Sequence, residues 1–449
     1  MTKKIIIIGA GPTGLGAAYR LNEMGYDNYK IIERNDYIGG LAASFQRDGY
    51  TMDIGGHVVF SHYPYFDKVV EDALDNAYLE HQREAWIWIY NKFVPYPFQN
   101  NIKFLPKEVT LECLNGLLET KAGSDAKNFG DWINNVFGEG IANHFMKPYN
   151  FKVWAHPLEL MSKDWIAERV SVVDFKSVLE KVILDQEDSN WGPNNTFRFP
   201  THGGTGQIFR RIADGLMDRI QLNKTVEFVD FDKKEIRYNT GETELYDVII
   251  NTSPLDKFVN NSNMKGQFQN NVEKLKFSSL FSVAVVINRP LDEDKKTKCW
   301  NYFPEKDVPF YRVTYLSNYS PNIVHDASKE FMLMSEISFS EFKHHDTESI
   351  VQETIDGLVN SGFINESDRD LVVFTDIVTE EYSYPIPTNE RDSVLDEVIP
   401  ILDSKDVYSR GRFGIWRYET GNMDHSFMQG VEVVNHIFEG KEEETRFKN

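Results

Sequence analysis

One segment near the N-terminus, Lys4–Arg34, constrains the fold more than any other part of the chain. It contains a β-branched run (Ile5–Ile8), three glycines spaced Gly-x-Gly-x-x-Gly, a stretch of helical periodicity and a second apolar run (Tyr29–Ile32). This order predicts a strand, a tight turn, a helix and a second strand, the arrangement that binds dinucleotides. A glycine triplet alone is weak support, but here its whole setting is present. We therefore expect a dinucleotide site.

Each glycine of the motif has a separate physical reason. Gly9 permits the tight turn after the strand, Gly11 lets the backbone approach a pyrophosphate, and Gly14 lets helix and strand pack closely. Glu33 closes the second strand about 20 residues further on, where an acidic side chain accepts hydrogen bonds from an adenosine ribose. All four residues are predicted to belong to the cofactor site.

Two further glycine-rich segments follow soon after. Gly39–Ser44 has small side chains that can lie against a flat ligand, and in Asp53–Phe60 paired glycines deliver His57 into a loop. The plain alternative for the second segment is a turn with a core histidine. Because both follow a nucleotide motif, they look like the flavin-facing wall of an FAD protein and favour FAD over NAD. The candidates in these segments are Gly40, Leu41 and Gly56.

Charge and cysteine content limit the classes of partner. The formal net charge is −21, so a sequence-independent attraction to nucleic acid or to an anionic membrane is not expected. An anionic ligand must therefore be held by a local cluster. The two cysteines, Cys113 and Cys299, have no metal-binding or redox spacing, which favours a reducing compartment and no metal site. Without an apolar stretch of about 18 residues, we expect no integral membrane segment and a cytoplasmic protein.

Three local patterns in the rest of the chain carry predictions. Stiff prolines around Tyr96, Phe98 and Gln99 offer an aromatic face beside an amide, which suits a planar base. Residues 105–190 have helical periods, and Tyr246–Thr252 has the character of a buried strand that returns to the dinucleotide sheet.

Two polar segments carry further expectations. Ser189–Asn195 is turn-rich, so we predict a mobile loop there. Asp424 and Ser426 precede the last helical pattern and are predicted to cap it, which would leave its N-terminal amides available to an acceptor.

The motifs converge on one family. The chain resembles the UDP-galactopyranose mutases, specifically their eukaryotic type, from Gly9 to about Glu432 and in the family's order. The combination covers nearly the whole chain and is far more specific than the glycine motif. It is carried by GGHVVFSHYPYFD, VPYPFQNNI, KPYNFKVWA, ERV, WGPNNTFRFPTHGGTG, PFYRVTYLSNYSP, YPIPT and SRGRFGIWRYETGNMDHSFMQGVE.

The resemblance implies a redox-neutral interconversion of UDP-galactopyranose and UDP-galactofuranose on reduced FAD. In that family the flavin N5 attacks the anomeric carbon and displaces UDP, which gives a covalent sugar adduct. Ring opening through an iminium, reclosure to the other ring size and return of UDP complete the cycle. This chemistry needs no pair of acid-base carboxylates, and we nominate none.

The resemblance also implies roles for individual residues. His57 matches the loop that adjusts to the flavin redox state and supports N5, while Arg169 and Arg312 match a diphosphate clamp. Surface salt bridges are the plain alternative for either arginine. The tyrosines near the diphosphate are Tyr302, Tyr384 and Tyr418, and the uridine side is matched by Tyr96, Gln99 and Asn150. The sugar pocket is matched by Phe60, Trp154, Asn194, Trp300 and Asn422, and the cofactor set is completed by Arg412, Asn422, Asp424 and Ser426.

One position departs from the eukaryotic-type pattern. There, an arginine and a serine two positions later help to bind NADPH, the external reductant. Arg83 matches the arginine, but Ala85 stands where the serine would be. The choice between NADPH and NADH is therefore open, whereas the isomerase chemistry is not affected.

Patterning and resemblance together predict an α/β protein with a discontinuous Rossmann-like FAD-binding domain, a helical domain with mobile loops, and an antiparallel-sheet substrate domain. The predicted bounds are 1–78, 195–262 and 400–449 for the first, 105–194 for the second, and 79–104 and 263–399 for the third.

Two other functions stay open beside the isomerase. A net FAD oxidoreductase of the amine oxidase and desaturase type shares the N-terminal fold but would not need Arg169, Arg312 or the pocket at Tyr96 and Gln99. A non-catalytic nucleotide-sugar sensor would bind UDP without turnover. The resemblance also leaves open the oligomeric state, a homo-oligomer included, and the tolerance of other UDP-pyranoses such as UDP-arabinopyranose.

Overall fold

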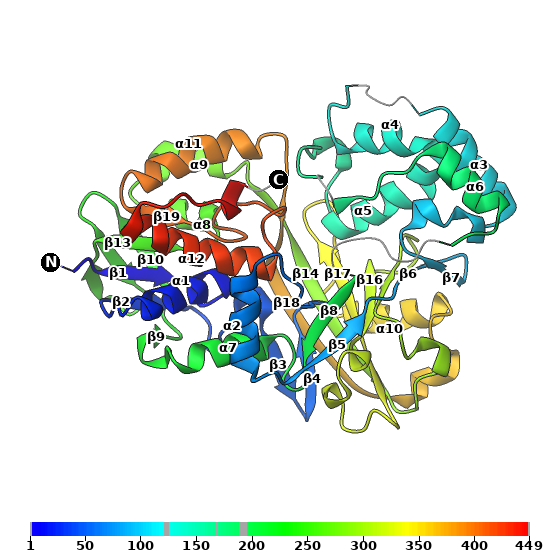
Figure 1. Cartoon of the computed structure of the whole chain (residues 1–449), viewed down its shortest axis with the longest axis horizontal. Helices are drawn as coiled ribbons and strands as arrows, with labels where there is room; N and C mark the ends of the chain where they lie inside the picture. Colours follow the sequence, from blue (N-terminus) through cyan, green and yellow to red (C-terminus); the bar gives the residue numbers. More distant parts are fainter. Residues whose placement is uncertain (1, 121–124, 167–168, 188–194, 448–449) are drawn as a thin grey trace.

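The structure, a computed structural model, describes residues 2–120, 125–166, 169–187 and 195–447. Figure 1 shows two halves side by side. One half combines the first and last segments of the chain, drawn in blue and red, and the other combines a large sheet with a group of helices drawn in cyan and green.

A five-stranded parallel sheet forms the centre of the first half. Its order is β19-β13-β1-β2-β9, and Ile5 of β1 lies between Val248 of β13 and Tyr29 of β2. The predicted strands and the return of the chain to this sheet are confirmed. The bounds are β1 (Ile5–Ile8), β2 (Tyr29–Ile32), β9 (Ile220–Gln221), β13 (Val248–Asn251) and β19 (Val407–Ser409).

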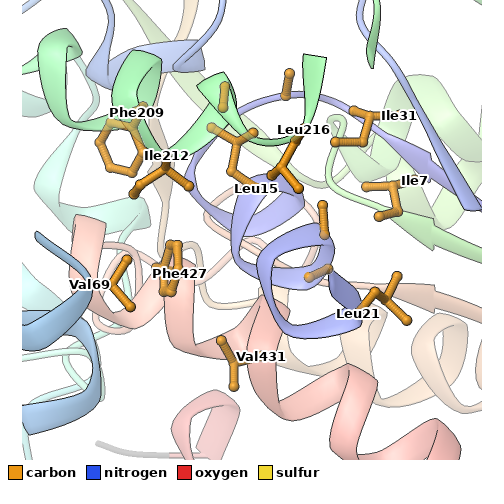
Figure 2. Close-up of a cluster of buried hydrophobic side chains, with 14 of the residues drawn as sticks. Ile7, Leu15, Leu21, Ile31, Val69, Phe209, Ile212, Leu216, Phe427 and Val431 are labelled. Atoms are coloured by element: carbon orange, nitrogen blue, oxygen red, sulfur yellow. The ribbon is translucent and has the colours of Figure 1, made fainter. Parts of the chain in front are cut away.

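The alternating isoleucines of β1 face two separate cores. Ile5 and Ile7 pack against helices on one face, and Figure 2 shows Ile7, Leu15 and Phe427 gathered there. Ile6 and Ile8 face the other core. The first core has α1 (Pro12–Glu23), α2 (Pro64–Leu74), α7 (Gly206–Asp214) and α12 (Met423–Glu439). The second has β10 (Val226–Asp230), β11 (Glu235–Tyr238), α8 (Leu255–Asn260), α9 (Lys265–Val272) and α11 (Arg391–Asp403), while β12 (Thr243–Leu245) pairs with β11 outside this core. Because β1 is covered on both faces, its carboxyl end at Gly9 is firmly placed.

A seven-stranded sheet forms the second half. Its order is β18-β14-β17-β16-β15-β6-β7, and all neighbours pair antiparallel except β15 and β6, which are parallel. The predicted antiparallel sheet therefore contains one parallel pair. The bounds are β6 (Ala85–Ile89), β7 (Lys92–Pro95), β14 (Lys276–Ile287), β15 (Trp300–Tyr302), β16 (Arg312–Tyr315), β17 (Phe331–Phe339) and β18 (Val372–Ile386), with α10 (Ile350–Asn360) packed on one face.

Helices fill the region predicted to be helical. Their bounds are α3 (Lys107–Leu118), α4 (Phe129–Ile141), α5 (Lys147–Trp154) and α6 (Phe175–Ile183), with a π-helical turn (Ala142–Met146) between α4 and α5. Their apolar faces share one core that includes Phe137 and Trp154. The predicted mobile loop, Ser189–Asn195, lies outside the described residues except for Asn195.

Two small antiparallel sheets complete the fold. β3 (Ser44–Arg47) pairs with β4 (Tyr50–Asp53), and β5 (Tyr78–Gln82) pairs with β8 (Thr196–Pro200). The second pair joins segments that fall on both sides of the predicted boundary at residue 78, and the three-domain division stays a prediction. Among the described helices, none has the length and apolar character needed to cross a membrane.

Candidate active site

A cavity of about 810 Å³ lies between the parallel sheet and the seven-stranded sheet. At one end it is lined by residues that follow β1 and β2, such as Gly9 and Glu33, and at the other by Trp300 and Arg312 from β15 and β16. Ligands of parallel α/β sheets bind at the carboxyl ends of the strands. The cavity therefore continues from the dinucleotide motif to the region predicted to bind substrate.

The glycines of the motif behave differently from one another. Gly9 has φ +103°, a conformation that L side chains rarely adopt, and a side chain there would also clash with Thr252. Gly11 and Gly40 face each other in the cavity wall, where a side-chain carbon on Gly40 would stand 3.3 Å from the Gly11 Cα. Gly14 is not in the wall. A side-chain carbon there would stand 1.9 Å from the Gly9 carbonyl oxygen, so Gly14 serves helix packing.

Glu33 is fixed by the backbone at the nucleotide end. Its Oε2 accepts a hydrogen bond from the Ala10 N–H at 2.8 Å, and its Oε1 accepts one from the Asn35 N–H at 2.8 Å. The side chain is buried and lines the cavity. Each carboxylate oxygen has a second lone pair, so Glu33 can still accept a ribose hydroxyl.

His57 and Gly56 form the middle of the wall, together with Leu41. The Trp300 indole N–H donates to the Gly56 carbonyl at 3.2 Å, which holds the loop against β15. Burial lowers the pKa of His57 to about 4, so its imidazole is neutral at pH 7. The buried Nδ1 of His57 has no hydrogen-bond partner among the described residues. An unpartnered buried nitrogen beside a bare glycine backbone fits a flat, polar ring system such as a flavin.

Arg312 is held by a buried carboxylate on the neighbouring strand. Its Nη2 donates to Glu336 Oε1 at 2.6 Å, and its Nε donates to Glu336 Oε2. The Tyr311 hydroxyl donates to the same carboxylate at 3.0 Å. Burial acts to lower the pKa of Arg312, but Glu336 overrides this effect and holds the pKa well above its usual range. Arg312 is therefore a fixed cation in the cavity wall.

Arg169 and Arg412 add positive charge at the same end. Arg169 donates to the backbone carbonyl of Glu419, and Arg412 donates to those of Ser383 at 3.1 Å and Gly421 at 3.0 Å. Burial lowers the pKa of Arg412. Within the described parts of the chain, no carboxylate pairs with Arg412. A cluster of cations in a protein of net charge −21 is a site for an anion.

Aromatic hydroxyls surround these arginines. The Arg412 guanidinium lies 5.1 Å from the Tyr384 ring and 5.4 Å from the Tyr418 ring. Tyr96 and Tyr302 are in contact, with ring centroids 5.3 Å apart. Burial raises the pKa of Tyr96, Tyr302 and Tyr384, so these phenols remain protonated donors. Phe60, Trp300 and the four tyrosines all line the cavity, as does Arg83.

The start of α12 closes the cavity near the middle. Asn422, Asp424 and Ser426 line it as predicted, but the prediction that the last two cap the helix is wrong. The helix begins at Met423 with Asn422 at its N-cap, so both side chains lie within the first turn. Asp424 instead accepts hydrogen bonds from the backbone N–H and ring of His62.

Three of the predicted substrate residues lie behind the wall. Gln99 is buried and donates to the Ser171 carbonyl at 2.5 Å, and Asn150 donates to the Met146 carbonyl at 2.7 Å. Trp154 is buried with its ring centroid 4.9 Å from that of Tyr418, which does line the cavity. None of the three is among the described residues that line the cavity, and their assignment to the substrate stays a prediction. Asn194 lies outside the described residues.

Sequence reasoning missed Glu336, the partner of Arg312. The signal was the single charged residue in the strand Phe331–Phe339, because a buried charge of this kind needs a cation beside it. Other wall residues that were not nominated are Arg34, Lys224 and Glu380.

The comparisons with known proteins agree with this site. Residues 12–400 match the model of the flavin containing amine oxidoreductase family. The crystal structure of a reduced UDP-galactopyranose mutase is 41% identical and has a TM-score of 0.96, covering 100% of this chain and 96% of that chain.

Two weaker likenesses carry less information. A putative protoporphyrinogen oxidase from Exiguobacterium sp. 255-15 shares the fold at 15% identity, with a TM-score of 0.74 and coverage of 98% of this chain and 100% of that one. A 4,4'-diaponeurosporene oxygenase of Staphylococcus aureus is 32% identical over 120 residues, which are 27% of this chain and 22% of that protein. The chain thus spans only about a fifth of the length of that curated relative.

The family match covers most of the chain, and the mutase likeness covers all of it at 41% identity, against 15% for the protoporphyrinogen oxidase. The chain therefore belongs to the flavin containing amine oxidoreductases and, within them, to the UDP-galactopyranose mutases.

Proposed function

We propose that this chain is a flavin-dependent isomerase that interconverts UDP-galactopyranose and UDP-galactofuranose, with FAD as its resident cofactor. One observation carries the proposal: a single cavity joins the dinucleotide motif at Gly9 and Glu33 to the cationic end formed by Arg169, Arg312 and Arg412. A cofactor and an anionic nucleotide-sugar can meet in such a cavity.

The wall residues divide into cofactor and substrate sets. Reduced FAD, when bound, supplies the nucleophile of the reaction. His57 presents a neutral ring to the cofactor, because burial keeps its pKa near 4, so it adds a hydrogen bond without adding charge. The residues proposed to hold FAD are Gly9, Gly11, Glu33, Gly40, Leu41, Gly56, Arg412, Asn422, Asp424 and Ser426.

The arginines hold the diphosphate. Arg312 is oriented by Glu336, and Arg169 by a backbone carbonyl, so both reach the cavity with little remaining freedom. Charge-assisted hydrogen bonds from these groups, with the hydroxyls of Tyr302, Tyr384 and Tyr418, would keep the UDP leaving group beside the sugar after the glycosidic bond breaks. Retention of UDP is what allows the isomer to reform.

Gln99, Asn150 and Trp154 have a supporting role in this proposal. Trp154 packs against Tyr418, and Asn150 lies on the same helix, α5. We infer that they set the position of the wall on the uridine side. Direct contact of the amide nitrogens of Gln99 and Asn150 with substrate would require them to leave their present hydrogen bonds.

A nicotinamide cofactor, NADPH or NADH, is the proposed external reductant. The support is Arg83, which is buried, lines the cavity and lies with its guanidinium 6.0 Å from the Tyr96 ring. Ala85 offers no hydroxyl to the 2′-phosphate of NADPH, so we infer only a weak preference between NADPH and NADH. Rates of anaerobic flavin reduction by each cofactor would test this point.

Three finer statements belong to the same proposal. The eukaryotic-type branch is supported by the motifs alone. A cytoplasmic location is supported by the two cysteines, Cys113 and Cys299, which are buried and unpaired as in a reducing compartment. Assembly into a homo-oligomer is open to measurement by light scattering.

Anaerobic incubation with dithionite and UDP-galactofuranose tests the proposal. We expect UDP-galactopyranose by chromatography only from the reduced enzyme, with no net consumption of reductant. Stoichiometric oxidation of the flavin during product formation would instead support the net oxidoreductase. Binding of UDP without turnover under dithionite would support a nucleotide-sugar sensor.

A further inference from the structure

A second cavity, which we call the α5 cavity, lies on the opposite side of helix α5 from the active site. Its volume is about 930 Å³, and its walls come from α5, from the loop 303–309, from the loop that follows β17 and from α10. Residues of α5 such as Tyr149 and Trp154 pack toward the active-site aromatics, whereas Lys147, Phe151 and Lys152 line the α5 cavity. Figure 1 shows α5 between the helical region and the large sheet.

Two lysines meet in this cavity, Lys152 buried and Lys343 partly buried. Lys152 is 4% exposed, and its Nζ donates to the Glu305 carbonyl at 2.7 Å. The Nζ of Lys343 donates to the Ser338 carbonyl at 2.9 Å and makes longer contacts with the carbonyls of Pro309 at 3.4 Å and Lys152 at 3.5 Å, which an anion would have to replace. Burial lowers the pKa of Lys343 to about 7 and that of Lys152 well below its usual range. In the described ranges, no carboxylate lies within ion-pair distance of either amine.

The acidic residues of the α5 cavity have other partners. Asp356 accepts from Arg369 at 2.5 Å and from Gln352 at 2.9 Å, and Glu353 accepts from the Ser349 hydroxyl at 2.5 Å while its Oε2 lies 3.7 Å from the Nδ1 of His345. Glu159 and Asp307 are exposed, at the mouth. Two desolvated amines therefore face the cavity without a carboxylate partner among the described residues, and a bound anion would favour their charged form.

A third group points to the same chemistry. His345 lines the α5 cavity, and its Nε2 is buried without a hydrogen-bond partner among the described residues. Lys343 has a structural explanation of its own, since a cation near the last carbonyls of α5 complements the helix dipole. Lys152 also lies in the last turn of α5, but its Nζ donates to the Glu305 carbonyl outside the helix, and the explanation does not extend to His345.

We propose that the α5 cavity is a second ligand site, which binds a small oxyanion, a carboxylate or a phosphate group, through Lys152, Lys343 and the Nε2 of His345. The site is separate from the active-site cavity and rests on different residues from the mutase proposal. Its failure would leave that proposal unaffected.

Calorimetric titration of the FAD-loaded, UDP-saturated enzyme tests the site. UDP occupies the active-site arginines, so added orthophosphate or malonate reports on the second cavity. We expect one saturable site per chain, and a loss of affinity of about tenfold or more in Lys343→Met, because a charge-assisted contact is removed. Lys329→Met, at an exposed lysine paired with Asp326, is the matched control and should bind like the parent.

The two anions distinguish the sources of the oxyanion. Tighter binding of orthophosphate assigns a phosphate-bearing ligand, and tighter binding of malonate assigns a carboxylate. If Lys343→Met does not fold, the rate at which Lys343 is acetylated in the unmodified enzyme is measured instead. A bound anion should slow this acetylation. Absence of saturable binding, or equal binding by parent and folded Lys343→Met, would overturn the proposal, as would labelling of Lys343 that the anion does not slow.

Discussion

Arg312 and Glu336 stand directly opposite each other on adjacent antiparallel strands, β16 and β17, and are joined by two parallel hydrogen bonds. Glu336 is 1% exposed, so its charge is compensated mainly by this guanidinium and by the Tyr311 hydroxyl. The pair therefore fixes the position of one cation of the active site in the middle of the sheet. Its geometry suggests tests of both partners.

Glu336→Gln should keep the shape of the contact but remove its charge. We expect turnover to fall by about tenfold or more and the unfolding free energy to fall by about 1–3 kcal/mol, because Arg312 loses its counter-ion in a buried site. Activity and denaturant unfolding measure the two effects. Glu341→Gln, at an exposed glutamate, is the control and should change neither. Parent-like activity in Glu336→Gln would show that the pair does not position Arg312.

Arg312→Lys keeps the positive charge but not the planar fork. A lysine cannot reproduce two parallel hydrogen bonds to Glu336 and still face the cavity, so the diphosphate would lose an oriented donor. We expect turnover to fall by about 10²-fold with FAD content unchanged, since the residue lies at the far end of the cavity from the nucleotide motif. Flavin absorbance per chain checks retention. Loss of flavin together with activity would assign Arg312 to cofactor binding instead.

Glu33→Ala should weaken FAD binding and leave the fold intact. The carboxylate is the group placed to accept the ribose hydroxyls, and its removal also frees the N–H groups of Ala10 and Asn35. We expect the dissociation constant for FAD to rise by about tenfold or more. Flavin fluorescence after dilution measures it, with circular dichroism as the check on folding. Full flavin occupancy after dilution would contradict the assignment.

The nucleotide end of the site could be predicted because its signals are local. Ile5–Ile8, Gly9 and Glu33 are linked by the short-range geometry of one strand-helix-strand unit, which a single sequence displays. The placement of Glu336 depends instead on the register between two strands. Register is set by packing across the sheet and is not visible in either segment alone.

At two places the structure differs from what the sequence suggests. Asp424 has the composition of a helix cap, but its carboxylate is engaged by His62 from a distant segment, and the helix starts before it. Gln99 and Trp154, assigned to substrate through the resemblance, are not among the described residues that line the cavity, and that assignment stays a prediction. In both cases tertiary contacts decided the position, and those contacts have no local signature.

Gly430→Ala tests the close packing of α1 and α12. A side-chain carbon at Gly430 would stand 2.0 Å from the Thr13 carbonyl oxygen, so the helices would have to separate. We expect the unfolding free energy to fall by about 1–3 kcal/mol despite the better helix propensity of alanine. Gly266→Ala is a matched control in α9, where nothing lies within 4 Å, and it should stabilise by up to about 1 kcal/mol. Equal effects of the two changes would exclude tight packing as the cause.

His57 should make the stability of the cofactor-free protein depend on pH. Burial lowers its pKa from 6.5 to about 4, so below about pH 6.5 the unfolded chain binds a proton that the folded chain does not. The contribution of His57 is therefore fully present above pH 6.5 and is lost as pH falls toward 4, and its size is on the order of 3 kcal/mol. Urea unfolding of the parent and of His57→Gln across this range measures it. Because His81 and His156 shift in the same direction, the difference between the two proteins is the informative quantity. That difference should move in favour of His57→Gln as pH falls, and a constant difference would mean that the imidazole is already exposed to water.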